Sequence, residues 1–350
     1  MRYKSKLSVI VIGWIRKGKR ADCGETMKNQ LMIQKLEELG IVCRQMDFKG
    51  WKHHPWVLVQ TLWNILIHKE DTIIFSTSTQ NVYPMMKLMK TKGWKANTVH
   101  WVIGGNLGDK VESGTYDAGV IGYMKHTLVE SNKMKEQLEI YGIKNVKQVA
   151  NFKPIPYYPK ISVYKEGKIK FVFVSRIMPD KGCDYIVEAA MLLNERGLSG
   201  HFSIDFYGKI ADDYKKMFEK KLEALSNVEY KGFLNLCENA GYDRLAEYDI
   251  MLFPTYWRGE GFAGVLIDAF IAGLPIIATD WAHNRQFLEE GKTALFIPVH
   301  NVKSLAETMQ KCIKGQVKIN EMKAACQQEA EKYNVDNVVT EQLLKEIGIK

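Results

Sequence analysis

Two carboxylates stand eight residues apart in the segment "RGEGFAGVLIDAF", residues 258–270. The small residues between them are Gly261, Ala263 and Gly264. Small side chains at a helix start let a ligand approach the unpaired backbone N–H groups, and the helix dipole favours an anion there. Asp268 lies four residues after Gly264, on the same helix face, where it could bind a vicinal diol such as ribose. Glu260 could reach another part of that ligand. The alternative is that Glu260 only stabilises the helix start and that Asp268 is solvated.

A second segment, "VSRIMPDKGCD" at residues 174–184, places two cations on either side of a proline turn. Arg176 and Lys181 follow an apolar run that is typical of a strand ending at Ser175. Arginine offers a planar fork of donors and lysine a point charge, which together suit a diphosphate at the mouth of a parallel sheet. On its own, the pair is equally compatible with an ordinary charged surface.

Both segments lie within an alternation of short β-branched runs and helical stretches that extends along the chain. The spacing predicts strands within 6–13, 41–46, 72–77, 98–105, 126–130, 146–150, 168–175, 202–208, 228–233, 249–254, 275–280 and 294–298. It predicts helices over or near 25–39, 56–67, 82–90, 182–196, 211–225, 238–247, 263–272, 302–314, 319–332 and 335–346. Such alternation is typical of parallel, doubly wound sheets, which bind ligands beyond the carboxyl ends of their strands.

The prolines of "NFKPIPYYPKISVYKEG", residues 151–167, mark a linker between two such halves. A chain of 350 residues is long enough for two domains. We therefore expect an α/β fold with two Rossmann-like, doubly wound domains facing a cleft. The expected limits are 1–153 and 154–334, with a C-terminal helix at 335–350 that could pack back on the first domain.

Several residues of the first half would lie near such a cleft, although each has an ordinary alternative. They are Gly13, Gly24, Glu25 and Thr26 around the first strand-to-helix connection, and His100, Gly104, Gly105 and His126 around two later strands. A simple helix start accounts for the first group equally well, and a histidine inside an apolar strand is more often a core residue. In the second half, His283 and Asn284 could reach a base or sugar, or Asn284 could simply begin a helix.

The positive charge is concentrated in the first half. The chain carries a formal net charge of +9, and residues 1–150 hold 23 Lys and Arg against 13 Asp and Glu, a net +10. Residues 151–350 hold 26 and 27, a net −1. This asymmetry predicts contact with an anionic membrane surface, unless the lysines are only a solvated face. The tryptophan-rich stretch 51–69 would be an interfacial helix or a core helix. A nucleic-acid-binding protein is an alternative of a different class, but no aromatic residues are clustered within a basic stripe, so we expect no nucleic-acid partner.

The remaining composition predicts a protein of the cytoplasm. Six cysteines form no C-x-x-C pair and no zinc spacing, which predicts reduced thiols and no metal site. Arg2, Lys4 and Lys6 precede the apolar run 7–15, but a basic stretch follows in place of a cleavage site, so we expect a buried strand and not a signal peptide. No stretch reaches the roughly 18 apolar residues of a membrane span. Peripheral attachment to the inner face of the cell membrane remains an expectation.

Taken together, the C-terminal half resembles the family-four retaining glycosyltransferases of the GT-B fold, of the type that builds polysaccharide and lipopolysaccharide. The segment "GEGFAGVLIDAFIAGLPIIATD" looks like the E-x7-E segment of that family, and Arg176 and Lys181 look like its diphosphate-binding pair. The order and spacing of "YGK" at 207–209, "KGF" at 231–233 and "YDIMLFP" at 248–254 also match. The similarity covers roughly 130–300, whereas the first 100 residues match only in general layout.

The resemblance implies transfer of a sugar from a nucleotide-sugar donor to a lipid-linked or polysaccharide acceptor, with retention of anomeric configuration and without a metal or cofactor. It implies catalytic roles for Arg176, Lys181 and Glu260, and donor contacts from Gly208, Gly261, Phe262, Ala263, Gly264, Val265 and Asp268. The first domain would bind the acceptor and the second the donor. The family usually has Glu where this chain has Asp268, a shorter side chain that a helix shift or a bridging water would compensate. A two-Rossmann sugar-nucleotide epimerase shares the layout and is the alternative enzyme.

Overall fold

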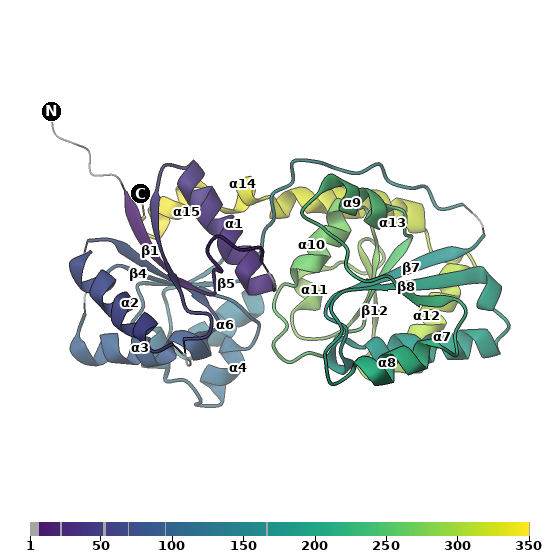
Figure 1. Cartoon of the computed structure of the whole chain (residues 1–350), viewed down its shortest axis with the longest axis horizontal. Helices are drawn as coiled ribbons and strands as arrows, with labels where there is room; N and C mark the ends of the chain where they lie inside the picture. Colours follow the sequence, from purple (N-terminus) through teal and green to yellow (C-terminus); the bar gives the residue numbers. More distant parts are fainter. Residues whose placement is uncertain are drawn as a thin grey trace. The chain divides into compact units, whose positions relative to one another are not determined.

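The structure, a computed structural model, describes residues 7–21, 23–51, 54–68, 70–94, 96–165 and 167–349. Its contacts divide the chain into two units. Unit 1 comprises the described residues of Met1–Pro154 together with Gly261–Ala263 and Lys332–Lys350, and unit 2 comprises Ile155–Glu260 and Gly264–Glu331. Each unit is a sheet with helices on both faces (Figure 1). The basic residues Arg2, Lys4 and Lys6 lie outside the described residues, as do positions 52, 53 and 69 of the tryptophan-rich stretch.

Unit 1 contains a parallel sheet with the strand order β2-β1-β3-β4-β5-β6 in its described part. The strands are β1 Ser8–Gly13, β2 Val42–Asp47, β3 Thr72–Thr77, β4 Thr98–Val102, β5 His126–Val129 and β6 Val146–Gln148. The chain runs from β1 to β2 on one side and returns to β3 on the other, so the order reverses between β1 and β3. Ligands of doubly wound sheets bind at the carboxyl ends of the strands on either side of such a reversal.

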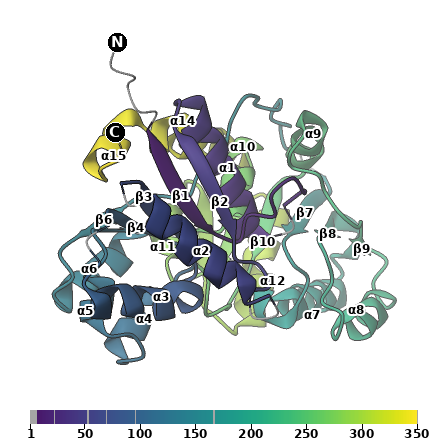
Figure 2. The same cartoon turned by 60° about the vertical axis from the view of Figure 1, so that its left-hand side comes forward.

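Two apolar layers cover this sheet because alternate residues of each strand point to opposite faces. Ile10, Ile12 and Phe75 pack on one face, with α3 Thr79–Lys92 and residues of α2 Trp56–Ile67, α4 Leu107–Glu112, α5 Ala118–Ile121 and α6 Asn132–Ile140. Val9, Val11 and Ile74 pack on the other, with α1 Gly24–Glu38 and the C-terminal α14 Val335–Val338 and α15 Glu341–Glu346. The end of the chain therefore completes the core of unit 1, with α14 beside α1 in both views (Figures 1 and 2).

Unit 2 repeats the plan with the strand order β12-β11-β10-β7-β8-β9. The strands are β7 Ile169–Val174, β8 Phe202–Tyr207, β9 Val228–Tyr230, β10 Ile250–Phe253, β11 Ile276–Thr279 and β12 Ala294–Ile297. The helices are α7 Cys183–Glu195, α8 Lys215–Leu222, α9 Asn239–Ala246, α10 Gly264–Ile271, α11 Asn284–Phe287, α12 Val302–Ile313 and α13 Ile319–Ala330, with 3-10 turns at Pro179–Lys181, Ser199–His201 and Glu331–Tyr333. Here the order reverses between β7 and β10, so the connections that leave these two strands form the expected ligand edge.

The predicted α/β class with two doubly wound sheets is confirmed. All the strand pairs of the two sheets are parallel over the described residues, which requires a crossover between consecutive strands. The short helices α4 and α5 were not predicted, because four to six residues are too few to show a helical period. Among the described residues, no helix is both long and apolar enough to cross a bilayer.

Candidate functional site

The two predicted cations and the first predicted carboxylate lie on the two connections that leave the reversal point of unit 2. Arg176 and Lys181 follow β7, and Glu260 ends the connection that follows β10. Lys181 and Glu260 meet there, with 2.5 Å between Nζ and Oε2, and both are buried, at 7% and 6% exposure. The Thr255 hydroxyl also donates to Oε2 of Glu260, at 2.8 Å. The fold thus brings residues 79 positions apart into one hydrogen-bonded group at the edge where a ligand is expected.

The turn after Lys181 fits against the end of β10 only because it contains a glycine. Gly182 has a φ of 77°, and a Cβ there would lie 2.2 Å from the carbonyl oxygen of Pro254. Gly208, at the end of β8, has a φ of 138°, and its Cβ would lie 1.8 Å from the carbonyl oxygen of Ser175. Gly208 is one of the predicted donor-binding residues. Independently of that role, glycine is needed here for close packing against the connection that follows β7.

Arg176 is exposed and lies over an aromatic ring of the connection that follows β10. Its guanidinium carbon is 5.7 Å from the centroid of the Trp257 ring. The carbonyl of Trp257 accepts a hydrogen bond from the indole N–H of Trp281, at 2.9 Å. This stacking joins the connection after β7 to the connection after β10, and such contacts contribute about 0.5–1 kcal/mol at exposed sites.

Asp268 lies inside α10 and is only 3% exposed, which excludes the alternative of a solvated position. The hydroxyl of Tyr242, from α9, donates to its carboxylate at 2.7 Å. Burial, followed by the charge of Asp268, raises the pKa of Tyr242, so this hydroxyl keeps its proton and acts as a donor. Ala263, Gly264 and Val265 lie at or just before the start of α10 and remain partly exposed. The first N–H groups of a helix have no intrahelical partner, so this end can offer donors to an anion.

Phe262 is arranged differently from its neighbours. It belongs to unit 1, is 2% exposed, and packs its ring edge-on against Tyr333 with centroids 4.7 Å apart. Its N–H donates to Oε2 of Glu130 at 2.8 Å, and its carbonyl accepts from the amide of Asn151 at 2.9 Å. A Cβ on Gly261 would lie 2.4 Å from the same Glu130 oxygen. The predicted donor contact through the Phe262 N–H is thus occupied by a carboxylate of the protein itself.

The remaining second-half candidates are also buried. His283 is 4% exposed and Asn284 is 1% exposed, just after β11. The side-chain N–H of Asn284 donates to the carbonyl of Thr279 at 2.9 Å. Asn284 begins α11, as one alternative predicted, and its Oδ1 has no hydrogen-bond partner among the described residues.

In unit 1, the candidates around the first connection gather at the reversal point between β1 and β3. A Cβ on Gly13 would lie 2.1 Å from the carbonyl oxygen of Ser76, so only glycine fits between the two strand ends. The Thr77 hydroxyl donates to Glu25 at 2.5 Å. Burial raises the pKa of Glu25 to about 7, against the lowering effect of Thr77, the Trp14 N–H and Lys49. Beside it, Gly24 is exposed. The hydroxyl of the buried Thr26 accepts from the Cys23 N–H at the start of α1, at 3.1 Å, and donates to the Cys23 carbonyl, at 2.9 Å.

The two histidines of the first half have other surroundings. His100 lies within β4 and is fully buried, and burial lowers its pKa to about 3, so it stays neutral as a core residue. His126 begins β5 and therefore lies at the amino end of that strand, opposite the edge that carries Glu130. Burial, then Lys125 and Lys147, lower the pKa of His126. Gly104 and Gly105 do lie at the carboxyl edge, and a Cβ on Gly261 would approach them to 3.3–3.4 Å.

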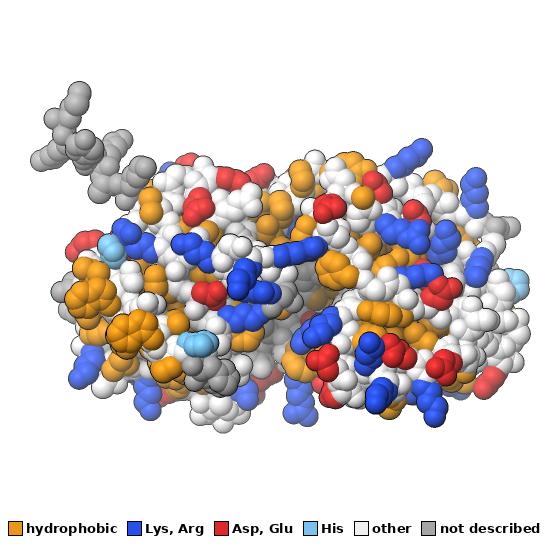
Figure 3. All heavy atoms as spheres, in the orientation of Figure 1, with side chains coloured by type: hydrophobic (Ala, Val, Ile, Leu, Met, Phe, Trp, Pro, Cys, Tyr) orange, Lys and Arg blue, Asp and Glu red, His pale blue; other side chains and the backbone are white. Residues whose placement is uncertain are grey.

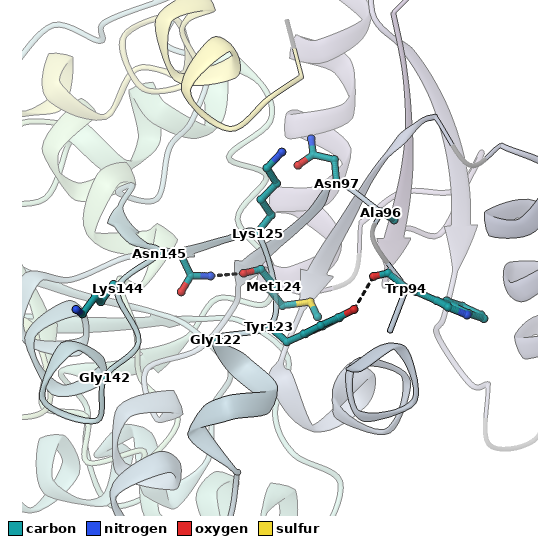
Figure 4. A pocket seen from close by; sticks show the side chains of 10 residues that line it. All are labelled: Trp94, Ala96, Asn97, Gly122, Tyr123, Met124, Lys125, Gly142, Lys144 and Asn145. Atoms are coloured by element: carbon teal, nitrogen blue, oxygen red, sulfur yellow. Dashed lines mark hydrogen bonds between the residues drawn. The ribbon is translucent and has the colours of Figure 1, made fainter. Parts of the chain in front are cut away.

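Unit 1 also has a pocket of about 630 Å³ away from this edge (Figure 4). Its lining comes from the segments that lead into β4, β5 and β6, at their amino ends, and includes Asn97, Lys125 and Asn145. Tyr123 closes one side by donating to the Trp94 carbonyl at 2.8 Å. Among the described residues, no group of three or more His, Cys, Asp and Glu could hold a metal ion.

Sequence reasoning missed three residues of unit 1 that surround the predicted residue Phe262: Glu130, its ion-pair partner Lys28, and Asn151. Lys28 and Glu130 are 102 residues apart, and Glu130 and Phe262 are 132 apart. No local pattern connects such residues. The one available signal was Glu130 itself, a charged residue directly after the apolar strand "HTLV", at the carboxyl end where parallel sheets carry their sites.

The chain is similar in sequence to curated glycosyltransferases. The chain is 24% identical over 214 residues to the poly(ribitol-phosphate) alpha-N-acetylglucosaminyltransferase of Staphylococcus aureus (strain COL), covering 61% of this chain and 41% of that protein. It is 27% identical over 236 residues to the UDP-N-acetylglucosamine--peptide N-acetylglucosaminyltransferase GtfA subunit of Streptococcus gordonii, covering 63% and 44%. The chain thus spans about two fifths of the length of these curated relatives.

The likeness in structure extends over nearly the whole chain. The sucrose-phosphate synthase of Thermosynechococcus elongatus superposes with a TM-score of 0.76 at 13% identity, covering 97% of this chain and 99% of that one. This likeness and the two Rossmann-like sheets give the chain the GT-B fold. The family model for glycosyl transferases group 1 matches residues 155–333, which is 179 of the 350 residues. The chain therefore belongs to the glycosyl transferases group 1 family.

Proposed function

We propose that the protein is a retaining, metal-independent glycosyltransferase that moves a sugar from a nucleotide-sugar donor to a lipid-linked or polysaccharide acceptor. The observation that carries this proposal is the grouping of Arg176, Lys181 and Glu260 at the reversal point of unit 2. Two cations and one carboxylate are suited to a ligand with a diphosphate at one end and hydroxyls at the other. The membership of the family and the names of its relatives support the same chemistry.

In this proposal, unit 2 binds the donor. Arg176 and Lys181 neutralise the diphosphate, and Glu260 binds hydroxyls of the sugar. The exposed start of α10, around Ala263, Gly264 and Val265, meets the sugar and phosphate through backbone N–H groups. Asp268 holds the ribose diol, with Gly208 close to the same nucleotide. Residues 154–334 would thus form the donor domain, and residues 1–153 the acceptor domain, with Glu25 and Gly13 on the acceptor side.

The reaction follows from where charge develops. The bond between the sugar C1 and the diphosphate oxygen breaks, and the acceptor oxygen forms the new bond to C1 on the same face. The acceptor proton passes to an oxygen of the departing diphosphate, so no separate base is needed. Arg176 and Lys181 stabilise the negative charge that grows on the leaving group, the role in which preorganised electrostatics contributes most. Because the protein supplies two cations, we expect no requirement for a divalent ion.

The test is release of nucleotide from a panel of nucleotide sugars, beginning with UDP-N-acetylglucosamine, with and without acceptor and with EDTA. We expect Arg176→Ala and Lys181→Ala each to lower kcat a hundredfold or more, since one electrostatic donor is typically worth on the order of 10²–10³. Lys292→Ala is the matched control, because this exposed lysine of unit 2 pairs with Glu289 ahead of β12. Activity lost in EDTA and restored by magnesium would contradict the metal-independent mechanism. Epimerised sugar nucleotide as product would support the alternative enzyme.

We also propose that unit 1 attaches peripherally to the anionic, cytoplasmic face of a membrane through α2. In α2, only Thr61 and Ile65 are buried. The exposed apolar residues are Trp56, Val59, Trp63, Leu66 and Ile67. They recur at helical spacing and therefore form one outward face. In Figure 3, apolar side chains gather over α2 with Lys and Arg nearby, an arrangement that suits the surface of an anionic bilayer.

A further inference from the structure

We propose that the basic turn 16–20 of unit 1 binds a phosphate group of the acceptor, and that this acceptor is a phosphorylated polyol or glycan. The inference rests on the proposed function, in which unit 1 binds the acceptor. The turn has the sequence "RKGKR" and lies in the connection from β1 to α1. The strand order of unit 1 reverses beside β1, so this connection leaves the sheet at the edge where ligands of doubly wound sheets bind.

Polar side chains of two neighbouring elements hold the backbone of this turn. Asp47, at the end of β2, accepts from the N–H groups of Ile15 and Arg16, at 3.2 and 2.7 Å. The side-chain amide of Gln30, from α1, donates to the carbonyls of Ile15 and Lys19, at 2.8 and 2.9 Å. The Lys19 N–H closes the turn by donating to the Arg16 carbonyl, at 2.9 Å. The backbone therefore has a fixed shape, although the residues at its tip are exposed.

Two residues of the turn have a left-handed backbone conformation. Gly18, the third residue of the turn 16–19, has a φ of 70°, as is common for glycine at that position. Arg16 has a φ of 53°, which is uncommon for a residue with a side chain. Such a conformation costs free energy, persists only where the surroundings impose it, and is found most often at binding and catalytic sites. At Arg16, the hydrogen bond to Asp47 supplies part of that constraint.

The two lysines of the turn carry charge that no carboxylate of the described residues neutralises. Lys17 and Lys19 are both exposed, and neither forms an ion pair with another described residue. Both line the same hollow, which lies beside the turn and has a volume of about 210 Å³. Two ammonium groups that face one hollow repel each other, and an anion bound there would remove this repulsion. The geometry therefore suits a phosphate, whose several oxygens can accept from both lysines.

The rest of the lining indicates what the phosphate is attached to. The polar residues around the hollow are Lys17, Lys19, Gln30, Gln34, Glu37 and Gln45. Glutamine amides donate to and accept from hydroxyl groups, and a carboxylate accepts from them. Glu37 would repel a ligand that is anionic throughout, whereas it can bind a hydroxyl that lies next to a phosphate. A phosphate that is esterified to a polyol or a sugar therefore fits the hollow better than an inorganic anion does.

The headgroups of an anionic membrane also carry phosphate, but the turn lacks the second feature of a membrane-binding surface. Residues 16–20 include no apolar side chain that could enter a bilayer, in contrast to the outward face of α2. A bilayer surface is also diffuse, and its attraction for cations needs neither a fixed turn nor a hollow. These differences favour a discrete ligand.

Binding of glycerophosphate, measured by titration calorimetry, tests the inference without any turnover. We expect Lys17→Gln/Lys19→Gln to weaken this binding by about tenfold or more, because two charge-assisted hydrogen bonds are lost. The matched control is Lys87→Gln/Lys92→Gln, which removes the same charge from exposed positions of α3 on the other face of the sheet. The control should stay within about twofold of the parent. Equal weakening in the two double variants would show that only the overall charge matters, and would overturn the site.

A second variant tests the fixed shape of the turn. Gln30→Leu keeps every charge but removes the donor that holds the carbonyls of Ile15 and Lys19. It should lower the affinity for glycerophosphate by about threefold or more, since the lysines are then held less firmly at the hollow. Parental affinity in Gln30→Leu would contradict a preformed site. Inorganic phosphate should bind the parent more weakly than glycerophosphate does, and equal affinities would refute the role of the hydroxyl groups.

Vesicles of phosphatidylglycerol present the same glycerophosphate chemistry in a membrane. If Lys17→Gln/Lys19→Gln lowered vesicle binding and left the binding of free glycerophosphate unchanged, the turn would serve membrane attachment and the proposal would be wrong. The inference and the proposed function can also fail separately. A parent that binds glycerophosphate but releases no nucleotide from any nucleotide sugar would refute the proposed function alone. A parent that turns over a nucleotide sugar but binds no glycerophosphate would refute this inference alone.

Discussion

Glu260 and Asp268 belong to one short segment, yet their surroundings differ. Glu260 is paired with the buried cation Lys181, whereas Asp268 accepts from the neutral hydroxyl of Tyr242. In the proposed function, Glu260 faces the reacting sugar and Asp268 the ribose. The ribose is held alike in the ground state and the transition state, so its contacts affect binding more than turnover.

Substitutions of the two acidic residues should therefore have different effects. We expect Glu260→Gln to lower kcat mainly, and Asp268→Asn to weaken UDP binding by roughly ten- to a hundredfold, since a hydrogen bond to a charged group contributes roughly 1.5–3 kcal/mol. Titration with UDP, with kinetics on UDP-N-acetylglucosamine, measures both. Tyr242→Phe is the control that removes the hydroxyl and keeps the carboxylate. Parental UDP affinity in Asp268→Asn together with weak UDP binding in Glu260→Gln would show that the roles are reversed.

Glu25 makes stability depend on pH in a predictable direction. Its pKa of about 7 in the folded protein lies above the ordinary value of 4.5, because burial disfavours its charged form. The folded chain therefore holds this proton where the unfolded chain releases it. The contribution of Glu25 to the free energy of unfolding is intact below pH 4.5 and falls as the pH rises towards 7.

Replacement of the Glu25 carboxyl should make the stability of the protein depend less on pH. Between pH 4.5 and 7, the free energy of unfolding of the parent should fall with each pH unit by up to roughly 1.4 kcal/mol more than that of Glu25→Gln. Urea unfolding at about pH 5 and about pH 7.5 measures the difference. Glu37→Gln, an exposed carboxylate of the same helix, should behave as the parent does. Parallel pH profiles for Glu25→Gln and the parent would contradict the raised pKa.

The residues of the site could be predicted only where a local pattern exists. Arg176, Lys181, Glu260 and Asp268 could be proposed because they lie in segments whose spacing suggests that chemistry. Glu130 and Lys28 were missed because their contact joins distant parts of the sequence. The prediction that the Phe262 N–H faces a ligand assumed an open helix start, whereas the structure places a carboxylate of unit 1 there.

At the scale of elements, the strands were predictable because each is a short β-branched run between turns. The helix expected at 263–272 appears as α10, Gly264–Ile271. By contrast, the residues of α2 are apolar apart from Gln60, Thr61 and Asn64, so its period could not show which apolar face is buried. Only the packing settles this, and it leaves Trp56 and Trp63 66% and 65% exposed.

The outward face of α2 gives a direct test of membrane attachment. We expect Trp56→Gln/Trp63→Gln to lower binding to phosphatidylglycerol vesicles at least tenfold, since burial of one large apolar side chain contributes roughly 1.5–3 kcal/mol. Binding of the parent should weaken as salt rises, because each basic residue near the surface contributes about 1 kcal/mol and is screened. Phe233→Gln, 71% exposed in unit 2, is the control. Equal binding to phosphatidylcholine vesicles, or none to either, would refute the attachment.

At the scale of the whole molecule, the C-terminal residues do not belong to the unit that precedes them in the sequence. Residues 332–349 follow all of unit 2 in the chain, yet their contacts are those of unit 1. Val339, Leu343 and Leu344 pack with Val9 and Ile74 in one apolar layer. The alternation of strands and helices predicts two halves, but the alternation itself does not specify which half the last helices cover, so packing of the helix at 335–350 on the first domain was expected only as a possibility. That choice depends on apolar area that only the folded sheet presents.

The C-terminal segment should therefore control the stability of strands that lie far before it in the sequence. Leu344 is fully buried, and Leu344→Ala should cost about 2–5 kcal/mol, as such core truncations do. Hydrogen exchange should show the loss in β1 and β3 of unit 1 and not in β7 and β8. Met309 is equally buried, in the core of unit 2. Met309→Ala should lower stability by a similar amount, with protection from exchange lost in β7 and β8 and not in β1 and β3. Because each substitution removes a side chain from one apolar cluster only, the two variants together distinguish the cores. Loss of protection in β7 and β8 on Leu344→Ala would show that the last helices stabilise unit 2 instead.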